Sequence, residues 1–252
     1  MDLTYIHIGK CGGTTLVHEI LRLEPSAKIL HLERPSLDEC DSNLLFFIRH
    51  PLRRFVSAFN HAKSIIDFDI EGVALDLLTT ENCPCPWRIK HKKENSGIAF
   101  DHEFDSLIKH FNSASELGEA LSASDFRDLE CALSLLARPA EHLFHGIGWY
   151  LYNGDLVRKF SNKILYVGTL EKAEESIDKI YSKLGKTREN KSLSIYRTSS
   201  MKYPTKLSKK AALNIRTFLL DSDYMALLAL RRTGHITKET FSEYWETSGI
   251  CE

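Results

Sequence analysis

The chain has 252 residues, and its 33 Lys and Arg against 34 Asp and Glu give a formal net charge of −1 at pH 7. Hydrophobic residues make up 43% and charged residues 27%, a composition typical of an ordinary globular protein. A protein that follows a nucleic-acid backbone usually has a basic excess, so this balance argues against a nucleic-acid partner. It still allows a local basic pocket for one small polyanion.

The sequence carries no signal of membrane insertion or export. No run approaches the roughly 20 apolar residues of a membrane span. We expect no signal peptide, because the chain reaches Gly12-Gly13 soon after its start. The cysteines follow no framework, which suits a reducing compartment, and they are Cys11, Cys40, Cys83, Cys85, Cys131 and Cys251. A cytoplasmic location is the resulting prediction.

The first quarter of the chain alternates short apolar runs with helical patterns. Leu3–Ile8 is predicted to be a strand, and Thr14–Leu23, with apolar residues on one face, a helix. Further strands are predicted at Lys28–Leu32 and Leu44–Ile48, the latter apolar enough for a buried parallel strand. A helix over Leu52–Ala62 follows, with Pro51 suited to its first turn.

The rest of the chain is predicted to be mostly helical. One further strand is expected at Ile164–Val167. The expected helices are Phe104–Phe111, Ala114–Leu121, Phe126–Leu136, Ala140–Tyr152, Leu170–Leu184, Ser208–Leu220 and Tyr224–Leu230. The prolines and charges of residues 79–97 indicate a loop or lid. Strands that alternate with helices predict a three-layer α/β fold with a mostly parallel sheet, in one domain over residues 1–252.

A glycine-containing segment joins the first predicted strand to the first predicted helix, and it reads Gly9-Lys10-Cys11-Gly12-Gly13-Thr14-Thr15. Paired glycines let backbone N–H groups approach an anion, and the helix start adds the positive end of its dipole. The threonine hydroxyls are further donors, and Lys10 adds a mobile positive charge. A Walker lysine follows its glycines, whereas Lys10 precedes them. The pattern therefore favours a phosphate site other than that of an ordinary ATPase or GTPase; a simple glycine turn is the alternative.

A basic segment follows the Leu44–Ile48 strand and opens the next helix, and it reads Arg49-His50-Pro51-Leu52-Arg53-Arg54-Phe55-Val56-Ser57. The guanidinium of Arg49 can bind a second phosphate through two N–H groups. Ser57, about two helical turns later, can add a hydroxyl. In the alternative interpretation, these arginines cap a strand and lie on a solvated helix face.

Together the two segments resemble the sulfotransferases that use 3′-phosphoadenosine-5′-phosphosulfate (PAPS), especially the carbohydrate group that includes heparan sulfate 2-O-sulfotransferase. The family's 5′-phosphosulfate loop, Lys-x-Gly/Ala-Gly/Ser-Thr, falls on Lys10, Gly12, Gly13, Thr14 and Thr15. Its 3′-phosphate motif, Arg-x-Pro-x-x-Arg-x-x-Ser-x-Tyr, falls on Arg49, Pro51, Arg54, Ser57 and, in place of the tyrosine, Phe59. Cys11 and Gly9 stand where the family often has Thr or Ser and Pro. Weaker similarities occur at Leu165–Glu171 and Tyr196–Pro204.

This resemblance implies a P-loop-like fold and the transfer of a sulfuryl group from PAPS to an acceptor hydroxyl, with 3′,5′-ADP as product and no metal. The acceptor implied is a carbohydrate or glycoconjugate. Lys10 would neutralise the leaving phosphate oxygen. The donor-binding residues implied are Lys10, Cys11, Gly12, Gly13, Thr14 and Thr15 for the 5′ side, Arg49 and Ser57 for the 3′-phosphate, and Arg197 from the late polar loop.

The proton acceptor has three candidates. Glu19 lies four residues after Thr15 on the same helical face, and related 3-O-sulfotransferases have a catalytic glutamate at the matching offset. His18 lies four residues after Thr14 and has a suitable ordinary pKa. The 2-O-sulfotransferases instead use a histidine outside this helix, for which His31 is the candidate by location. Glu19 ranks first, and His31 and His18 follow.

Other interpretations stay open at this stage. A P-loop-like kinase would need Mg²⁺ ligands and a Walker lysine, and a non-catalytic nucleotide-binding protein would keep the loop without the chemistry. Cys83 and Cys85 with His91 resemble a zinc site, but no second cysteine pair accompanies them. At helical spacing, His142, His145, Trp149 and Tyr150 suit a sugar-binding face or, preferably, a helix packed on the sheet.

Overall fold

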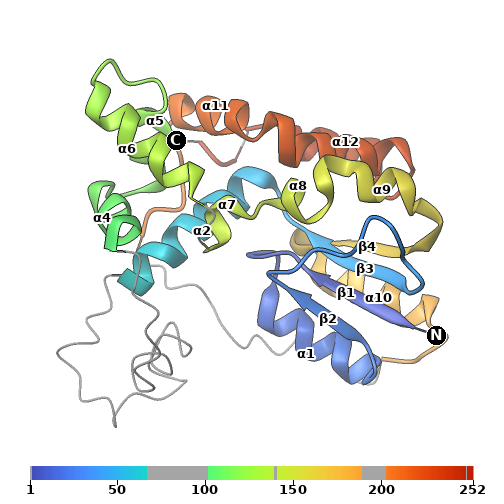
Figure 1. The fold of residues 1–252 in the computed structure, drawn as a ribbon. Helices are drawn as coiled ribbons and strands as arrows, with labels where there is room; N and C mark the ends of the chain where they lie inside the picture. The colour runs from blue at the N-terminus through green and yellow to red at the C-terminus, as the bar shows by residue number, and fades with distance from the viewer. Residues whose placement is uncertain (1, 67–101, 139–140, 189–202, 248, 252) are drawn as a thin grey trace, which may run out of the picture.

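The computed structural model describes residues 2–66, 102–138, 141–188, 203–247 and 249–251 (Figure 1). A parallel sheet of four strands, in the order β2-β1-β3-β4, forms its centre. The strands are β1 (Leu3–His7), β2 (Lys28–His31), β3 (Asn43–Ile48) and β4 (Ile164–Thr169). All four predicted strands are therefore confirmed, and all of them are parallel.

The burial of each strand follows from its place in the sheet. From Leu44 to Ile48 every residue of β3 is buried, as a central parallel strand covered on both faces requires. In contrast, β2 at the edge buries only Leu30. Strand β1 pairs with β2 on one side and with β3 on the other, from Leu3 opposite Asn43 to Ile6 opposite Phe46. The carboxyl ends of β1, β2 and β3 thus lie side by side.

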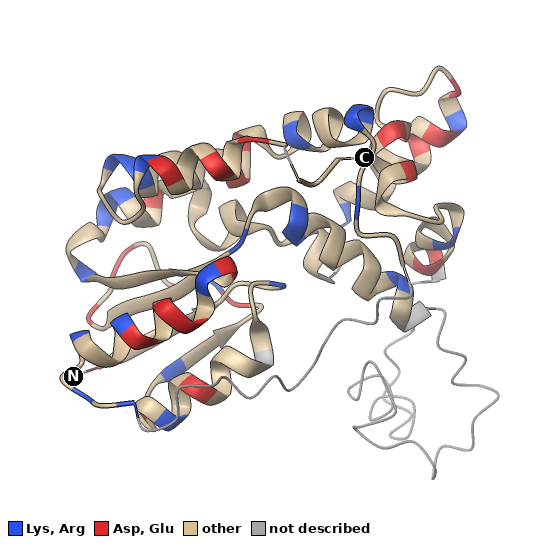
Figure 2. Ribbon diagram, turned by 180° about the vertical axis from the view of Figure 1, so that it is seen from behind, with Lys and Arg blue, Asp and Glu red and all other residues tan. Residues whose placement is uncertain are grey.

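Helices cover both faces of the sheet, which confirms the α/β architecture. Helices α1 (Gly13–Leu23) and α10 (Ala173–Lys183) lie along one face (Figure 1). On the other face lie α8 (Ile147–Tyr150), α9 (Asp155–Lys159) and α12 (Met225–Arg232). Basic and acidic residues are interspersed along the outer helices (Figure 2), in keeping with the formal net charge of −1.

A helical part extends from the carboxyl edge of the sheet (Figure 1). Its longest helix, α2 (Pro51–Ile66), begins where β3 ends. The others are α4 (His102–His110), α5 (Ala114–Ala120), α6 (Phe126–Ala137), α7 (Glu141–Phe144), α11 (Lys209–Phe218) and α13 (Lys238–Trp245). Side-chain oxygens cap the first N–H groups of several helices, and the capping residues are Ser113, Asp125, Ser208 and Thr237.

The prediction of one helix over Ala140–Tyr152 is wrong. The chain breaks at Gly146 between α7 and α8, and a 3₁₀ turn follows at Tyr152–Gly154. The break coincides with close packing, because a Cβ on Gly146 would lie 2.3 Å from Asp223 Oδ1. Asp223 belongs to a π-helical turn, Leu220–Tyr224, between α11 and α12.

Other boundaries also differ from expectation. The helix predicted over Leu170–Leu184 begins as a 3₁₀ turn, Leu170–Lys172, before α10, and a further 3₁₀ turn, Ser161–Lys163, precedes β4. Helices α9 and α13 were not predicted. The loop or lid expected at residues 79–97 lies outside the described residues. None of the helices in the described part of the chain combines the length and apolar character needed to cross a membrane.

Candidate functional site

The segment between β1 and α1 is a tight loop with strained backbone. Lys10 has φ of 66° and Gly12 φ of 95°, both in the left-handed region. A side chain at Gly12 would also clash, since its Cβ would lie 2.5 Å from Leu16 Cδ1 and 2.8 Å from Leu170 Cδ1. The first N–H groups of a helix have no acceptor within it. The loop and the start of α1 together therefore have the character of an anion-binding site.

Cys11 occupies a different environment from the one expected of a phosphate ligand. Its side chain is 1% exposed and packs in the core, and burial raises the pKa of its thiol to about 12. Its backbone N–H donates to the carbonyl oxygen of Ile8 at 3.2 Å. Cys11 thus shapes the loop from within, while Thr14 and Thr15 lie in the first turn of α1.

Arg49 joins the two predicted phosphate motifs. It follows β3 directly, and its Nη1 donates to the carbonyl oxygen of Lys10 at 3.3 Å. Burial lowers the pKa of the Arg49 guanidinium. From β1 the chain goes to β2 on one side and then crosses to β3 on the other, so the gap between β1 and β3 is the switch point of the sheet. Open parallel sheets bind ligands at such a point, beyond the carboxyl ends of the strands.

The second arginine of the motif has a structural position. Arg54 is fully buried on α2, where its Nη1 donates to the carbonyl oxygen of His142 at 2.8 Å. Its Nε lies 3.5 Å from Oδ2 of Asp223, which is also fully buried. Arg54 thereby fixes α7 and the π-helical turn against α2. Ser57, half-buried, lies on the helix face of Arg53, four residues after it.

Glu171 is a site residue that sequence reasoning did not single out. At the end of β4, its Oε1 accepts a hydrogen bond from the backbone N–H of His50 at 3.0 Å. Its Oε2 accepts one from the hydroxyl of Tyr244 at 2.5 Å. The carboxylate therefore anchors the turn that carries Arg49. The similarity of Leu165–Glu171 to the family pattern was the signal that could have identified it.

Four histidines gather beside the loop, and we call them the histidine cluster: His7 on β1, His31 on β2, His61 on α2 and His142 on α7. His7 Nδ1 and His31 Nδ1 are 2.8 Å apart, and the two rings stack at 4.5 Å. The ring of His142 lies 6.2 Å from that of His31 and 5.6 Å from that of His61. Of these residues, only His31 was a predicted catalytic candidate.

Glycines of the loop allow the histidine rings to lie against it. A Cβ on Gly9 would lie 2.2 Å from His142 Nδ1, and one on Gly13 would lie 2.8 Å from His7 Nε2. Gly9 stands where the family that the two motifs resemble usually has proline, and a larger residue here would collide with His142. The rings consequently pack directly on the backbone of the expected phosphate site.

The histidine cluster is electrostatically unfavourable for protonation. Burial, His31 and Lys10 together lower the pKa of His7 to about 4, with burial the largest cause. Burial also lowers the pKa of His142 to about 2, with Lys10 the next cause. The pKa of His31 is lowered by burial too. These rings are therefore neutral at pH 7, and Lys10 lies near enough to influence both His7 and His142.

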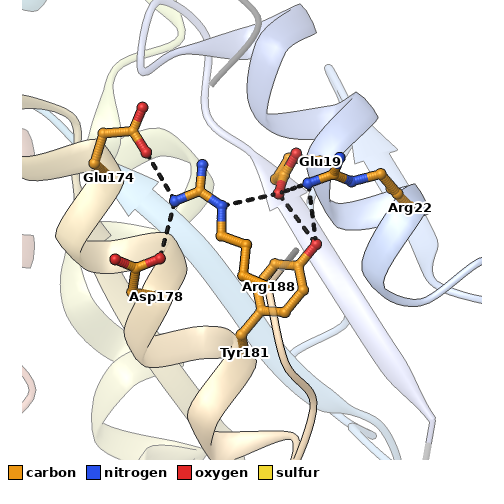
Figure 3. A network of polar contacts seen from close by, with 6 residues as sticks. All are labelled: Glu19, Arg22, Glu174, Asp178, Tyr181 and Arg188. Atoms are coloured by element: carbon orange, nitrogen blue, oxygen red, sulfur yellow. Dashed lines mark hydrogen bonds and ion pairs between the residues drawn. The ribbon is translucent and has the colours of Figure 1, made fainter. Parts of the chain in front are cut away.

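Glu19 lies in a different place, in a polar network between α1 and α10 (Figure 3). Its Oε1 accepts hydrogen bonds from Arg22 Nη2 at 2.7 Å and from the hydroxyl of Tyr181 at 3.1 Å. Arg188 Nε is 3.6 Å from the same oxygen. Arg188 Nη1 in turn lies 2.7 Å from Glu174 and 2.9 Å from Asp178. We call these six residues the α1–α10 network.

The remaining predicted residues are distributed as follows. His18 lies on the exposed side of α1. Arg197, Cys83 and Cys85 lie outside the described residues. Within the described residues, no group of three or more His, Cys, Asp or Glu side chains is arranged to hold a metal ion.

The expected core position of the aromatic segment after α7 is confirmed for Tyr150, which is fully buried. Its neighbour Trp149 is half-buried, and its ring centroid lies 4.0 Å from that of His145. Arg34 Cζ lies 5.2 Å from the Trp149 ring and 3.4 Å from that of Tyr152. Arg54 connects this group to the histidine cluster, because it donates hydrogen bonds to the carbonyl oxygens of both His145 and His142.

Comparisons with known proteins add no assignment: no protein-family model matches the chain, and searches of curated proteins and of solved structures found no match. The function of the chain is therefore inferred from its own residues and from the resemblance of its two motifs to those of the PAPS-dependent sulfotransferases.

Proposed function

We propose that the protein is a sulfotransferase that moves a sulfuryl group from PAPS to an acceptor hydroxyl. The observation that supports this most is the contact between Arg49 and the Lys10 carbonyl. It brings the two segments that we propose to bind anions together at the switch point of a parallel sheet. PAPS carries phosphates on both its 3′ and 5′ positions, and a site with two separate phosphate-binding segments suits such a nucleotide.

The donor would be held mainly by backbone groups and by two cations. The N–H groups of the loop and of the start of α1, with the hydroxyls of Thr14 and Thr15, would bind the 5′-phosphosulfate. Arg49 and Ser57 would bind the 3′-phosphate; Arg197, which the resemblance also implies, lies outside the described residues. In-line sulfuryl transfer builds up negative charge on the leaving phosphate oxygen, and Lys10 is the cation proposed to neutralise it.

His31 is our proposed proton acceptor. It lies at the end of β2 beside His7, and its lowered pKa keeps it neutral at pH 7. Glu19 was the first candidate from the sequence, but its Oε1 already accepts hydrogen bonds from Arg22 and Tyr181. His18 has no comparable support. The scheme requires no metal.

The acceptor proposed is a carbohydrate or glycoconjugate, on the strength of the motif resemblance alone. A P-loop-like phosphotransferase is the second candidate function, and the position of Lys10 before the glycines argues against it. A non-catalytic nucleotide-binding protein is the third, and it would keep the loop contacts without turnover.

Transfer of radiolabelled sulfate from PAPS to a panel of glycans tests the proposal. We expect label to enter at least one glycan with the wild-type chain and not with Lys10→Ala. Lys28→Ala is the matched control, because Lys28 is exposed at the opposite end of the sheet. Binding of PAPS without transfer to any acceptor would favour the non-catalytic alternative. Phosphate transfer from ATP would favour the phosphotransferase.

A further inference from the structure

The hydrogen bond between His7 and His31 joins two nitrogens of the same kind. Both atoms are Nδ1, and they are 2.8 Å apart. Because both rings are neutral at pH 7, each carries one proton, on either Nδ1 or Nε2. One ring must therefore donate from Nδ1 and keep a bare Nε2. The other must accept at Nδ1 and carry its proton on Nε2.

The two rings differ in what their Nε2 atoms face. A Cβ on Gly13 would meet His7 Nε2 at 2.8 Å, so this edge of the His7 ring lies on the first residue of α1, within the expected anion site. His31 is exposed at the end of the edge strand β2. An anion beside Gly13 attracts an N–H and repels a lone pair. It would therefore favour the arrangement in which His7 carries its proton on Nε2.

We propose that His7 is a positioning residue that couples occupancy of the anion site to the proton acceptor. With an anion in the loop, His7 donates from Nε2 towards it and accepts at Nδ1 from His31. His31 is then left with a bare Nε2 directed away from His7. The empty site allows the reverse arrangement, in which His31 Nε2 carries a proton and cannot act as a base. This scheme rests on the proposed function, because the proton that moves is that of the acceptor hydroxyl in the proposed sulfuryl transfer.

The proton and electron balance of the step is simple. The acceptor oxygen forms its bond to sulfur, and the bond from sulfur to the bridging phosphate oxygen of PAPS breaks. The bond's electrons stay on the phosphate of 3′,5′-ADP. The hydroxyl proton moves to His31 Nε2, and the resulting imidazolium is stabilised by its Nδ1–H bond to His7. Solvent takes up this proton after product release.

The surroundings of the pair agree with this direction of coupling. Lys10 lies close to His7 and lowers its pKa, as does His31. His142, with His61 beside it, approaches His31 from α7. The ring centroid of Tyr5, on the same strand, lies 6.3 Å from that of His7. Burial and the charge of Lys10 disfavour a third proton on the pair, so that two neutral rings joined by one Nδ1–H···Nδ1 hydrogen bond are the stable state.

Nitrogen-15 NMR of the histidine rings tests the proposal on the wild-type chain, with 3′,5′-ADP and, separately, inorganic pyrophosphate as the probes. In the occupied state at pH 7.5 we expect His7 Nε2 to be protonated and His31 Nε2 to be bare. A protonated His31 Nε2 in the occupied state would overturn the proposal, as would rings that do not respond to either anion. If pyrophosphate sets the arrangement but 3′,5′-ADP does not bind, the coupling stands and the proposed donor is wrong.

Variants add a kinetic test. His7→Phe removes both nitrogens, and we expect kcat to fall by about tenfold to a hundredfold, part of the ~10²–10⁴ that a general base supplies. His7→Asn offers an oxygen near the position of Nδ1 and is expected to recover part of this loss. Affinity for 3′,5′-ADP should change much less than kcat. His110→Phe, on α4 and paired with Asp128, is the control. Equal kcat in wild type and His7→Phe would contradict the proposal.

Discussion

The histidine cluster and the α1–α10 network are two polar groups built in opposite ways. In the network every cation has a carboxylate close by, and Arg188 has two within 3 Å. In the histidine cluster, burial and neighbouring basic groups, Lys10 among them, lower the pKa values of His7 and His142. One group pairs each of its cations with a carboxylate, and the other keeps its rings neutral beside a lysine.

This contrast distinguishes polar groups that stabilise the fold from polar groups that we propose to take part in the reaction. A network in which every arginine already contacts a carboxylate joins two helices, and few of its polar groups remain to bind a ligand. A partly buried cluster that disfavours further positive charge, next to helix N–H groups, gains most when an anion arrives. The lowered pKa values of His7 and His31, at the carboxyl ends of β1 and β2, therefore mark the side of α1 where we propose the chemistry, while Glu19 belongs to its stabilising side.

The largest expected effect is the loss of Lys10. Replacing it by Ala keeps the same left-handed backbone requirement but removes the charge that we propose to face the leaving group. We expect the transfer rate to fall by about 10²–10³-fold, as for other groups that stabilise developing negative charge. Steady-state transfer of labelled sulfate measures this, with Lys28→Ala as control. A rate within error of wild type would remove Lys10 from the chemistry.

Variants of His31 and Glu19 test whether the histidine cluster serves catalysis and the α1–α10 network serves stability. We expect His31→Asn to lower kcat by about a hundredfold with little loss of stability, since His31 is exposed. Glu19→Gln should instead lower the free energy of unfolding by roughly 1–3 kcal/mol, because it weakens the contacts of Arg22 and Arg188. Chemical denaturation and kinetics on both variants are the measurements. The opposite pattern would restore Glu19 as the base.

Arg49 and Arg53 form a matched pair for testing the 3′-phosphate. We expect Arg49→Ala to weaken binding of 3′,5′-ADP by about 10- to 150-fold, the value of a charge-assisted hydrogen bond of 1.5–3 kcal/mol. Binding of 5′-AMP should weaken less, because it lacks the 3′-phosphate. Arg53→Ala, which removes an exposed side chain, should change neither. Calorimetry on the four combinations decides the assignment, and an equal loss for both nucleotides would contradict it.

The smallest effect concerns stability against pH. The folded-state pKa of His7 is about 4, below the ordinary value of 6.5, so the unfolded chain binds the extra proton first. Stability is then fully present above pH 6.5 and is lost as the pH falls towards 4, with a slope of up to about 1.4 kcal/mol per pH unit. His7→Asn should flatten this dependence in denaturation curves at pH 7, 6 and 5. An unchanged slope would show that His7 is protonated in the folded protein.

Local patterns were sufficient to predict the strands, the loop after β1 and the start of α1, because these depend on neighbouring residues. The meeting of Arg49 with Lys10 follows from the placement of β3 beside β1, which no local signal determines. The histidine cluster combines residues from four separate elements, and only His31 among them was predicted from the sequence as a catalytic residue. Glu19 illustrates the limit, since its helical position was right while its partners come from α10 and the residues after it.

Calorimetric titration of the wild-type chain with 3′,5′-ADP and with Mg-ATP tests the central claim most directly. Only a site with two separate phosphate-binding segments should require the 3′-phosphate. We predict that 3′,5′-ADP binds at least about tenfold more tightly than Mg-ATP, a difference of about 1.4 kcal/mol. Binding of Mg-ATP without binding of 3′,5′-ADP would contradict the proposed function.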